Sequence, residues 1–240
     1  MLTFHGEPFL RQLRIERAEA HVTCDRLRHG VYHIKGTNRG CSVGCDAMDI
    51  LGTAIGDNNC HAIVADYYGT ASWLEQLRDT LYETLPHDRS LHWPIRLAEA
   101  IPVGVCLKPV FHQYFAWLLT LRECFRSALP YLTPLVELNS RVIAGEAVTA
   151  LEWSKVSASV HSEVSKRYVE NGADLLLEVN YITQNYSGQY GSTFRSAVYH
   201  FLKLPRVEAN KQDLYERAAD KLIELLQASG KKEVTNGPIT

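Results

Sequence analysis

SWLEQLRDTLYETLP, residues 72 to 86, has the pattern that decides the fold. Its leucines recur every three or four residues, at positions 74, 77, 81 and 85, and this spacing places them on one face of an α-helix. Ser72 and Glu75 have the spacing of a capping box at its start, and Pro86 ends it because proline cannot continue a helix. Helical spacing recurs along the chain and period-two alternation is scarce, so we predict an all-α fold.

The same periodicity divides the chain into about eight to ten helices, with VYHI at 31–34 as one short strand. Helical spacing extends over residues 8–29, the stretch from Gly40 to Leu51, 60–68, 72–85, 93–101, 109–129, a stretch ending at 143, 149–170, 173–186, 193–203 and a last stretch ending at 230. Residues 109–129 are apolar on almost every side, so this helix needs neighbours all around it. We therefore expect a single multi-helix domain over residues 1–230, with 145–150 as the one candidate seam and 231–240 as a mobile tail.

Composition and charge are those of an ordinary globular protein. Hydrophobic residues make up 46% and charged residues 22% of the 240 residues, and the formal net charge is −2. That charge does not indicate a nucleic-acid partner. Every apolar run is shorter than the roughly 18 residues of a membrane span, and we interpret the six cysteines as reduced. We expect a cytoplasmic, soluble protein with no membrane partner, and the sequence leaves its oligomeric state open.

KGTNRGCSVGCDAMD, residues 35 to 49, is the segment where we look first for function. Cys41 and Cys45 are four residues apart, so a helix would present both thiols on one face. Thiolates suit zinc or iron, and His61 is a candidate third ligand, but a structural zinc site needs four ligands and the spacing matches no standard zinc signature. We assign no metal site, and name Cys41, Cys45 and His61 as the residues that zinc or iron would use.

A reactive thiol is the second interpretation of this segment. Cys41 lies where a helix is expected to begin, and the unpaired N–H groups and dipole of a helix N-terminus stabilise a thiolate. In a thiol-dependent enzyme, His61 would be the base and Asp66 would orient it. Since no family-specific Cys/His signature is present, the sequence does not decide whether the protein is an enzyme.

An anion site is the third interpretation. Gly40 and Gly44 allow the backbone to approach a phosphate or carboxylate closely, and Lys35 and Arg39 add positive charge. These residues would bind a small anionic ligand. The segment lacks the Lys-Ser/Thr pair that completes a P-loop, so its sequence alone does not identify a nucleotide site.

Close packing is the fourth interpretation and the one we favour. Gly40 and Gly44 overlap the Cys41 and Cys45 pair in a face of small residues, which lets a neighbouring helix approach. The leading functional hypothesis is then a ligand-binding or protein-interaction protein with its site at this helix start. A regulatory protein of phage or mobile-element type would instead use the surface of Arg11, Arg14 and Arg17, or the tyrosines 186 and 190, for a macromolecular partner, although a solvated face is the commoner role of such arginines.

The order of motifs between residues 24 and 120 resembles a family of bacterial and phage helical proteins with a G-C-x-V-G-C motif. The matching stretches are Asp25-Arg-Leu, Gly30-Val-Tyr32, Arg39-Gly-Cys-Ser-Val-Gly-Cys45, LEQLRDTLYETLP at 74–86 and WPIRLAEAIPVGVCL at 93–107. The acid that follows His61 departs from the family pattern, since it is displaced to Asp66. The resemblance implies one helical module and no chemistry, because that family has no assigned activity.

Overall fold

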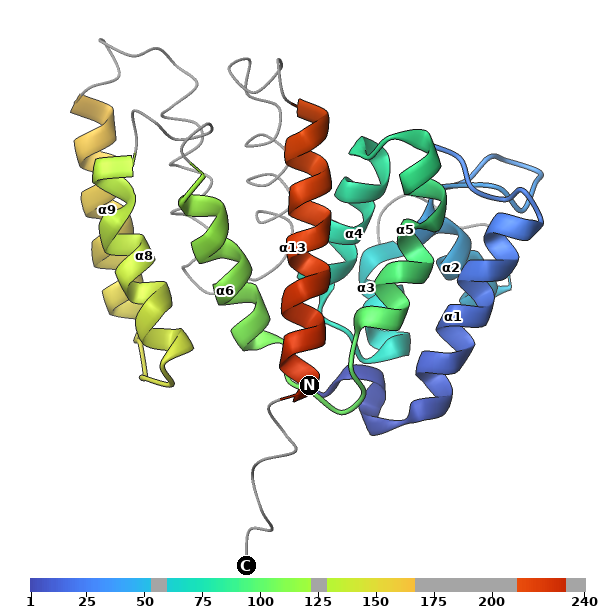
Figure 1. Ribbon diagram of the computed structural model, residues 1–240, viewed down its shortest axis with the longest axis horizontal. Helices are drawn as coiled ribbons and strands as arrows, with labels where there is room; N and C mark the ends of the chain where they lie inside the picture. The colour runs from blue at the N-terminus through green and yellow to red at the C-terminus, as the bar shows by residue number, and fades with distance from the viewer. Residues whose placement is uncertain (53–59, 122–128, 167–210, 232–240) are drawn as a thin grey trace, which may run out of the picture. The chain divides into compact units, whose positions relative to one another are not determined.

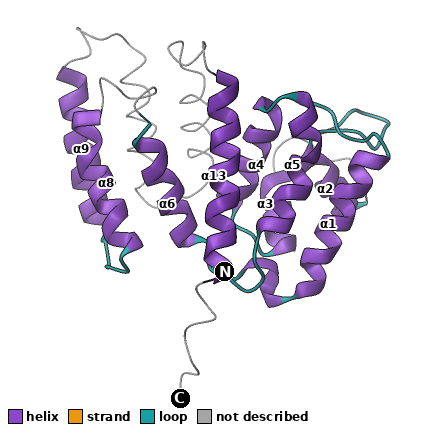
Figure 2. Cartoon of the chain, in the orientation of Figure 1, coloured by secondary structure: helices purple, strands orange, loops and turns teal. Residues whose placement is uncertain are grey.

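The computed structural model describes residues 1–52, 60–121, 129–166 and 211–231, which form nine α-helices and no strand (Figures 1 and 2). The helices are α1 (Pro8–Thr23), α2 (Ser42–Leu51), α3 (Cys60–Tyr68), α4 (Ser72–Thr84), α5 (His87–Ala100), α6 (Lys108–Leu119), α8 (Leu129–Ile143), α9 (Ala150–Lys166) and α13 (Lys211–Lys231). The all-α prediction is confirmed. The helices expected at 173–186 and 193–203, the loop with tyrosines 186 and 190, and the tail after Lys231 lie outside the described residues.

The chain divides into two compact units. The first contains Met1–Leu107 together with the chain from Tyr215, and the second is Lys108–Leu214. The expected seam at 145–150 is not the boundary, because these residues lie between α8 and α9, which contact each other within the second unit. The single domain stays a prediction. None of the helices that the structure describes is long and apolar enough to cross a membrane.

Helix α4 is the centre of the first unit. It contacts α2, α3 and α5 (Figure 1). Its predicted leucine stripe is buried, with Leu74, Leu77 and Leu81 fully covered. Helix α5 begins at His87 and contains Pro94, so the predicted start at Trp93 is wrong. Pro86 occupies the N-cap of α5, which explains why α4 ends and α5 follows it directly.

Ion pairs inside the first unit join α1, α2 and α4. The guanidinium of Arg14 is 2.7 Å from Glu75, and that of Arg78 is 2.7 Å from Asp46 and 3.2 Å from Glu75. All four side chains are buried. The predicted capping box is therefore wrong: Ala71 is the N-cap of α4, and the Glu75 carboxylate points into the core, where Thr70 also donates to it at 2.6 Å.

Helix α1 differs from its prediction in both length and orientation. It ends at Thr23, well before the expected end at residue 29, and Asp25 just beyond it has a left-handed backbone with φ 51°. Its buried residues are Arg14, Ala18 and His21, so the face that it turns to the core is partly charged. A hydrophobicity pattern assigns arginine to the solvent, whereas here a carboxylate from α4 makes its burial favourable.

Asp49 extends the ion-pair network to the surface and gives it a pH dependence. Burial opposes its ionisation, but hydrogen bonds from His21 (2.7 Å) and Arg26 (2.8 Å between the charged groups) outweigh burial and lower the pKa of Asp49 to about 2. A carboxyl with a lowered folded-state pKa stabilises the fold above its unfolded pKa near 3.8, and this stabilisation is lost as the pH falls through the folded value.

We therefore expect Asp49 to contribute about 2 kcal/mol to the free energy of unfolding near neutral pH, and to lose it between roughly pH 4 and pH 2. Urea unfolding across this range measures the loss. Asp49→Asn should be less stable than the wild type near pH 6 and approach it in stability near pH 2. A constant difference between the two proteins across the range would contradict the lowered pKa.

The connection between α1 and α2 contains the stretch VYHI, which is not a strand. An isolated bridge pairs Leu27 with Gly40, and the backbone of this connection bonds to itself and to the start of α2. Ile34 N–H donates to the Arg39 carbonyl at 2.8 Å, and Cys41 N–H donates to the Val31 carbonyl at 2.7 Å. Because these backbone groups already form hydrogen bonds within a compact turn, no ladder of paired strands forms among the described residues.

Candidate functional site

The start of α2 is tightly packed around its glycines. A Cβ atom on Gly40 would lie 2.0 Å from the Tyr32 carbonyl oxygen, and one on Gly44 would lie 1.7 Å from the same atom. Real Cβ atoms do not approach so closely, so both positions require glycine. The packing interpretation holds for these two residues, but their neighbour is the 31–34 backbone and not another helix.

The two cysteines of the motif face different groups. Cys41 is the N-cap of α2 and its sulfur accepts from the Gly44 N–H at 3.4 Å. The Cys45 thiol contacts the carbonyls of Gly40 at 3.6 Å and Arg26 at 3.7 Å, and burial raises its pKa to about 12. Cys45 is thus held as a neutral thiol among carbonyls, which is a poor environment for a metal ligand.

Cys41 belongs to a cluster with two carboxylates of α4. One ligating atom each from Cys41, Asp79 and Glu83 lies within 4.8 Å of the others. Asp79 and Glu83 are four residues apart, so they share one face of α4, and that face meets the start of α2. Cys41 and Asp79 are 1% and 3% exposed, whereas Glu83 is half-buried, so the cluster lies just beneath the surface.

A second layer of groups contacts these carboxylates. His61 Nε2 is 3.2 Å from Asp79 Oδ2, and the Tyr32 hydroxyl donates to the same oxygen at 3.3 Å. The rings of Tyr32 and His61 pack edge to face, with their centroids 5.6 Å apart. Gly30 N–H donates to Glu83 Oε2 at 2.7 Å. The two carboxylates are therefore oriented by the Gly30 backbone, the Tyr32 side chain and a histidine of α3.

The surroundings of Cys41 disfavour the ionised thiolate that a reactive cysteine needs. Burial raises the pKa of Cys41 well above its usual value, and the negative charge of Asp79 raises it further. Asp79, and not His61, is the group next to the sulfur, so the Cys–His contact of a thiol-dependent enzyme is not formed. The helix N-terminus does not compensate for burial and for the neighbouring carboxylate.

The other predicted residues do not assemble into a cradle for an anion. Lys35 and Arg39 are exposed, and Arg39 pairs with Asp25 at 3.0 Å. The Gly40 N–H donates to the Arg26 carbonyl and is therefore not available to an anion. Asp66 is exposed at the end of α3, where its own carbonyl contacts His5, so the carboxylate partner of His61 is Asp79.

The sequence analysis missed Asp79 and Glu83 because they belong to a helix that was interpreted as structural. Their only signal was a spacing of four residues, which is common on solvated helix faces. What distinguishes them is the approach of α2, which the sequence does not show. Cys41 and His61 were both predicted, and the structure places each of them next to Asp79.

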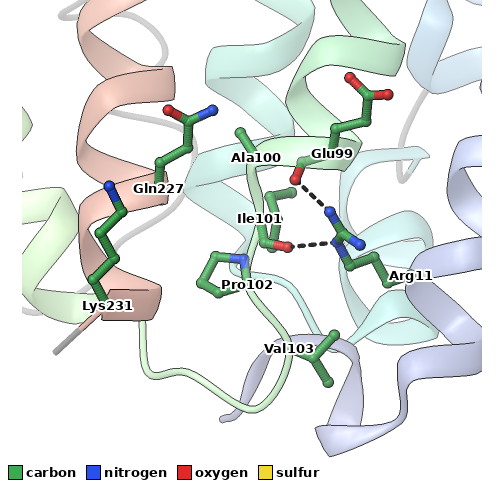
Figure 3. A pocket seen from close by; sticks show the side chains of 8 residues that line it. All are labelled: Arg11, Glu99, Ala100, Ile101, Pro102, Val103, Gln227 and Lys231. Carbon is green, nitrogen blue, oxygen red and sulfur yellow. Dashed lines mark hydrogen bonds between the residues drawn. The ribbon is translucent and has the colours of Figure 1, made fainter. Parts of the chain in front are cut away.

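A pocket of about 400 Å³ lies elsewhere in the first unit, where α5 ends (Figure 3). Its lining residues are Arg11, Glu99, Ala100, Ile101, Pro102, Val103, Gln227 and Lys231. Figure 3 shows the Arg11 side chain turned to the backbone, where it donates to the carbonyls of Ile101 at 3.2 Å and Glu99 at 2.5 Å. The Arg11 cation is therefore already paired with backbone carbonyls.

The three arginines of α1 do not form the solvated face that we expected. Arg11 contacts backbone carbonyls, Arg14 is buried against Glu75, and Arg17 donates to the Tyr68 hydroxyl at 3.1 Å. Arg17 also lies over the ring of Tyr67. The row therefore stabilises the first unit, and this removes the basis for a phosphate-binding surface there.

Comparison of the chain with protein-family models, curated proteins and solved structures found no match. A functional proposal must therefore come from the chemistry of the site.

Proposed function

We propose that the protein binds a divalent transition-metal ion, with Zn²⁺ as the best fit, through Cys41, Asp79 and Glu83. The observation that supports this proposal is the convergence of one sulfur and two carboxylate oxygens within 4.8 Å. The sequence predicts a ligand-binding protein, and the metal ion would be its ligand. It replaces Cys45 of the predicted ligand set with the two carboxylates of α4, and makes His61 a partner of Asp79.

The donor set determines the kind of metal. Thiolate sulfur favours Zn²⁺ and similar ions over Mg²⁺ and Ca²⁺, which prefer oxygen ligands only. Bonds of about 2.0–2.3 Å put neighbouring ligands of a tetrahedral zinc roughly 3.5 Å apart, so the three groups need to close by only about 1 Å. Three protein ligands leave one position for water or a substrate, as in catalytic zinc sites.

Charge also favours a dication at this place. Asp79 is buried, Glu83 is half-buried, and two carboxylates beside a thiol repel each other when all are ionised. A bound dication offsets this repulsion and stabilises the Cys41 thiolate, which burial alone disfavours. The guanidinium of Arg78 is paired with Asp46 and Glu75, and these two carboxylates offset its positive charge.

We expect the chelator-treated protein to bind one Zn²⁺ per chain, measured by titration calorimetry and elemental analysis. Cys41→Ser, Asp79→Asn and Glu83→Gln should each weaken binding by more than about 100-fold, since even outer-shell partners of a metal site contribute 10- to 100-fold. Binding of Co²⁺ should produce a sulfur-to-metal charge-transfer band that Cys41→Ser removes.

Cys45→Ala is the matched control, because Cys45 is a buried cysteine of the same helix outside the cluster. It should bind Zn²⁺ like the wild type. Equal affinity in the wild type and Cys41→Ser, or no Zn²⁺ binding by the folded wild type, would reject the proposal. Far-UV circular dichroism of each variant distinguishes a lost ligand from a lost fold.

A further inference from the structure

We propose that residues 30–39, which we call the strap, close over the metal site, and that strap closure and metal binding stabilise each other. This inference rests on the proposed metal site and describes its regulation. The strap lies within the connection between α1, which ends at Thr23, and α2, which begins at Ser42. Its position is tied to every proposed ligand, as the contacts of each ligand show.

Both carboxylate ligands accept hydrogen bonds from the strap. Gly30 N–H donates to Glu83 at 2.7 Å, and the Tyr32 hydroxyl donates to Asp79 at 3.3 Å. Groups that hydrogen-bond metal-ligating carboxylates fix their orientation and raise metal affinity. Gly30 and Tyr32 are therefore positioning residues for the two ligands on α4.

The third ligand is tied to the strap through its backbone. Cys41 N–H donates to the Val31 carbonyl at 2.7 Å, and the Tyr32 carbonyl fills the space left by Gly40 and Gly44. A shift of the strap would therefore disturb the start of α2 together with both α4 carboxylates. One ten-residue segment thus connects the two helices that carry the ligands.

The backbone of the strap depends on two glycines for its shape. Gly30 and Gly36 have φ of 79° and 78°, a left-handed conformation that glycine adopts without strain. Outside the strap's contacts with the site, Val31 and Ile34 are 41% and 38% exposed. These exposed apolar side chains contribute little to holding the strap closed. Its stability depends on the hydrogen bonds to the site and on the contacts of its end, where Arg26 donates to the Asn38 carbonyl at 2.8 Å and Arg39 pairs with Asp25.

Coupling follows from shared groups. A bound metal holds the Asp79 and Glu83 carboxylates in place, so their ordering no longer has to accompany the hydrogen bonds from Gly30 and Tyr32. By linkage, the free energy by which bound metal stabilises the closed strap equals the free energy by which strap closure strengthens metal binding. The closed strap is thus the state with the higher affinity for metal.

The test is amide hydrogen exchange of the full chain with and without Zn²⁺, alongside calorimetry. Exchange of the Gly30 amide, which bonds to Glu83, should slow by about tenfold or more with Zn²⁺. Exchange in α9, in the second unit, is the internal control and should not change. Zn²⁺ binding with unchanged exchange at Gly30 overturns the strap and leaves the metal site intact, whereas no Zn²⁺ binding rejects both.

Tyr32→Phe tests the same coupling by weakening the strap instead of by adding metal. It removes only the hydroxyl that bonds Asp79, and we expect Zn²⁺ affinity to fall by about tenfold and the protection of Gly30 by Zn²⁺ to decrease. Tyr67→Phe, on α3, is the control and should keep wild-type values. Wild-type affinity and protection in Tyr32→Phe would overturn the coupling.

Discussion

Glu75→Gln is expected to destabilise the first unit by about 3–5 kcal/mol, because it leaves buried positive charge without its counter-ion. The Glu75 side chain is fully buried and lies between Arg14 at 2.7 Å and Arg78 at 3.2 Å. The substitution keeps the size of the side chain and removes its charge. Among the residues that the structure describes, Asp46 would then be the acid left to offset both guanidinium groups.

Urea unfolding followed by far-UV circular dichroism measures this loss, provided that both proteins unfold with the same dependence on urea. Glu224→Gln is the control, since Glu224 forms an exposed ion pair with Lys221 in α13. It should change the free energy of unfolding by about 0.5 kcal/mol or less. If Glu75→Gln costs no more than this control, the buried pairing of Glu75 with the two arginines is wrong.

The same ion pairs show why the sequence predicted α4 well and α1 poorly. The leucines of α4 point to the core because apolar burial is their only favourable option, so spacing alone identified their face. In α1 the buried positions include Arg14 and His21. Their burial depends on acids from α2 and α4, and a pattern within one helix contains no information about its neighbours.

The residues of the candidate site were likewise only partly predictable from the sequence. Cys41 and the two glycines were identified because they lie close together in the sequence and combine reactive with small residues. Asp79 and Glu83 became ligand candidates only when α2 and α4 were seen to pack together. Cys45 was grouped with Cys41 on spacing, but Cys41 is an N-cap with an extended backbone, so the two residues do not share a regular helical face.

Gly44→Ala is the substitution for which sequence and structure predict opposite signs. Within a helix, alanine is more favourable than glycine by about 1 kcal/mol, so propensity alone predicts a more stable protein. In the structure the new Cβ would lie 1.7 Å from the Tyr32 carbonyl oxygen, and this neighbour is backbone. Such overpacking costs typically 1–3 kcal/mol, and a clash this close to backbone belongs at the top of that range, so after the gain in propensity we expect a net loss of about 2 kcal/mol.

Gly36→Ala separates this clash from a general cost of alanine in the region. A Cβ on Gly36 would meet open space, so only its left-handed φ of 78° opposes the change, at about 1–2 kcal/mol. Urea unfolding should therefore rank Gly44→Ala as the less stable variant. Zn²⁺ titration should show a weaker site in Gly44→Ala, because the displaced Tyr32 carries its hydroxyl away from Asp79. A stabilised Gly44→Ala with wild-type affinity would mean that the strap does not pack on α2, and the proposed coupling would lose its structural basis.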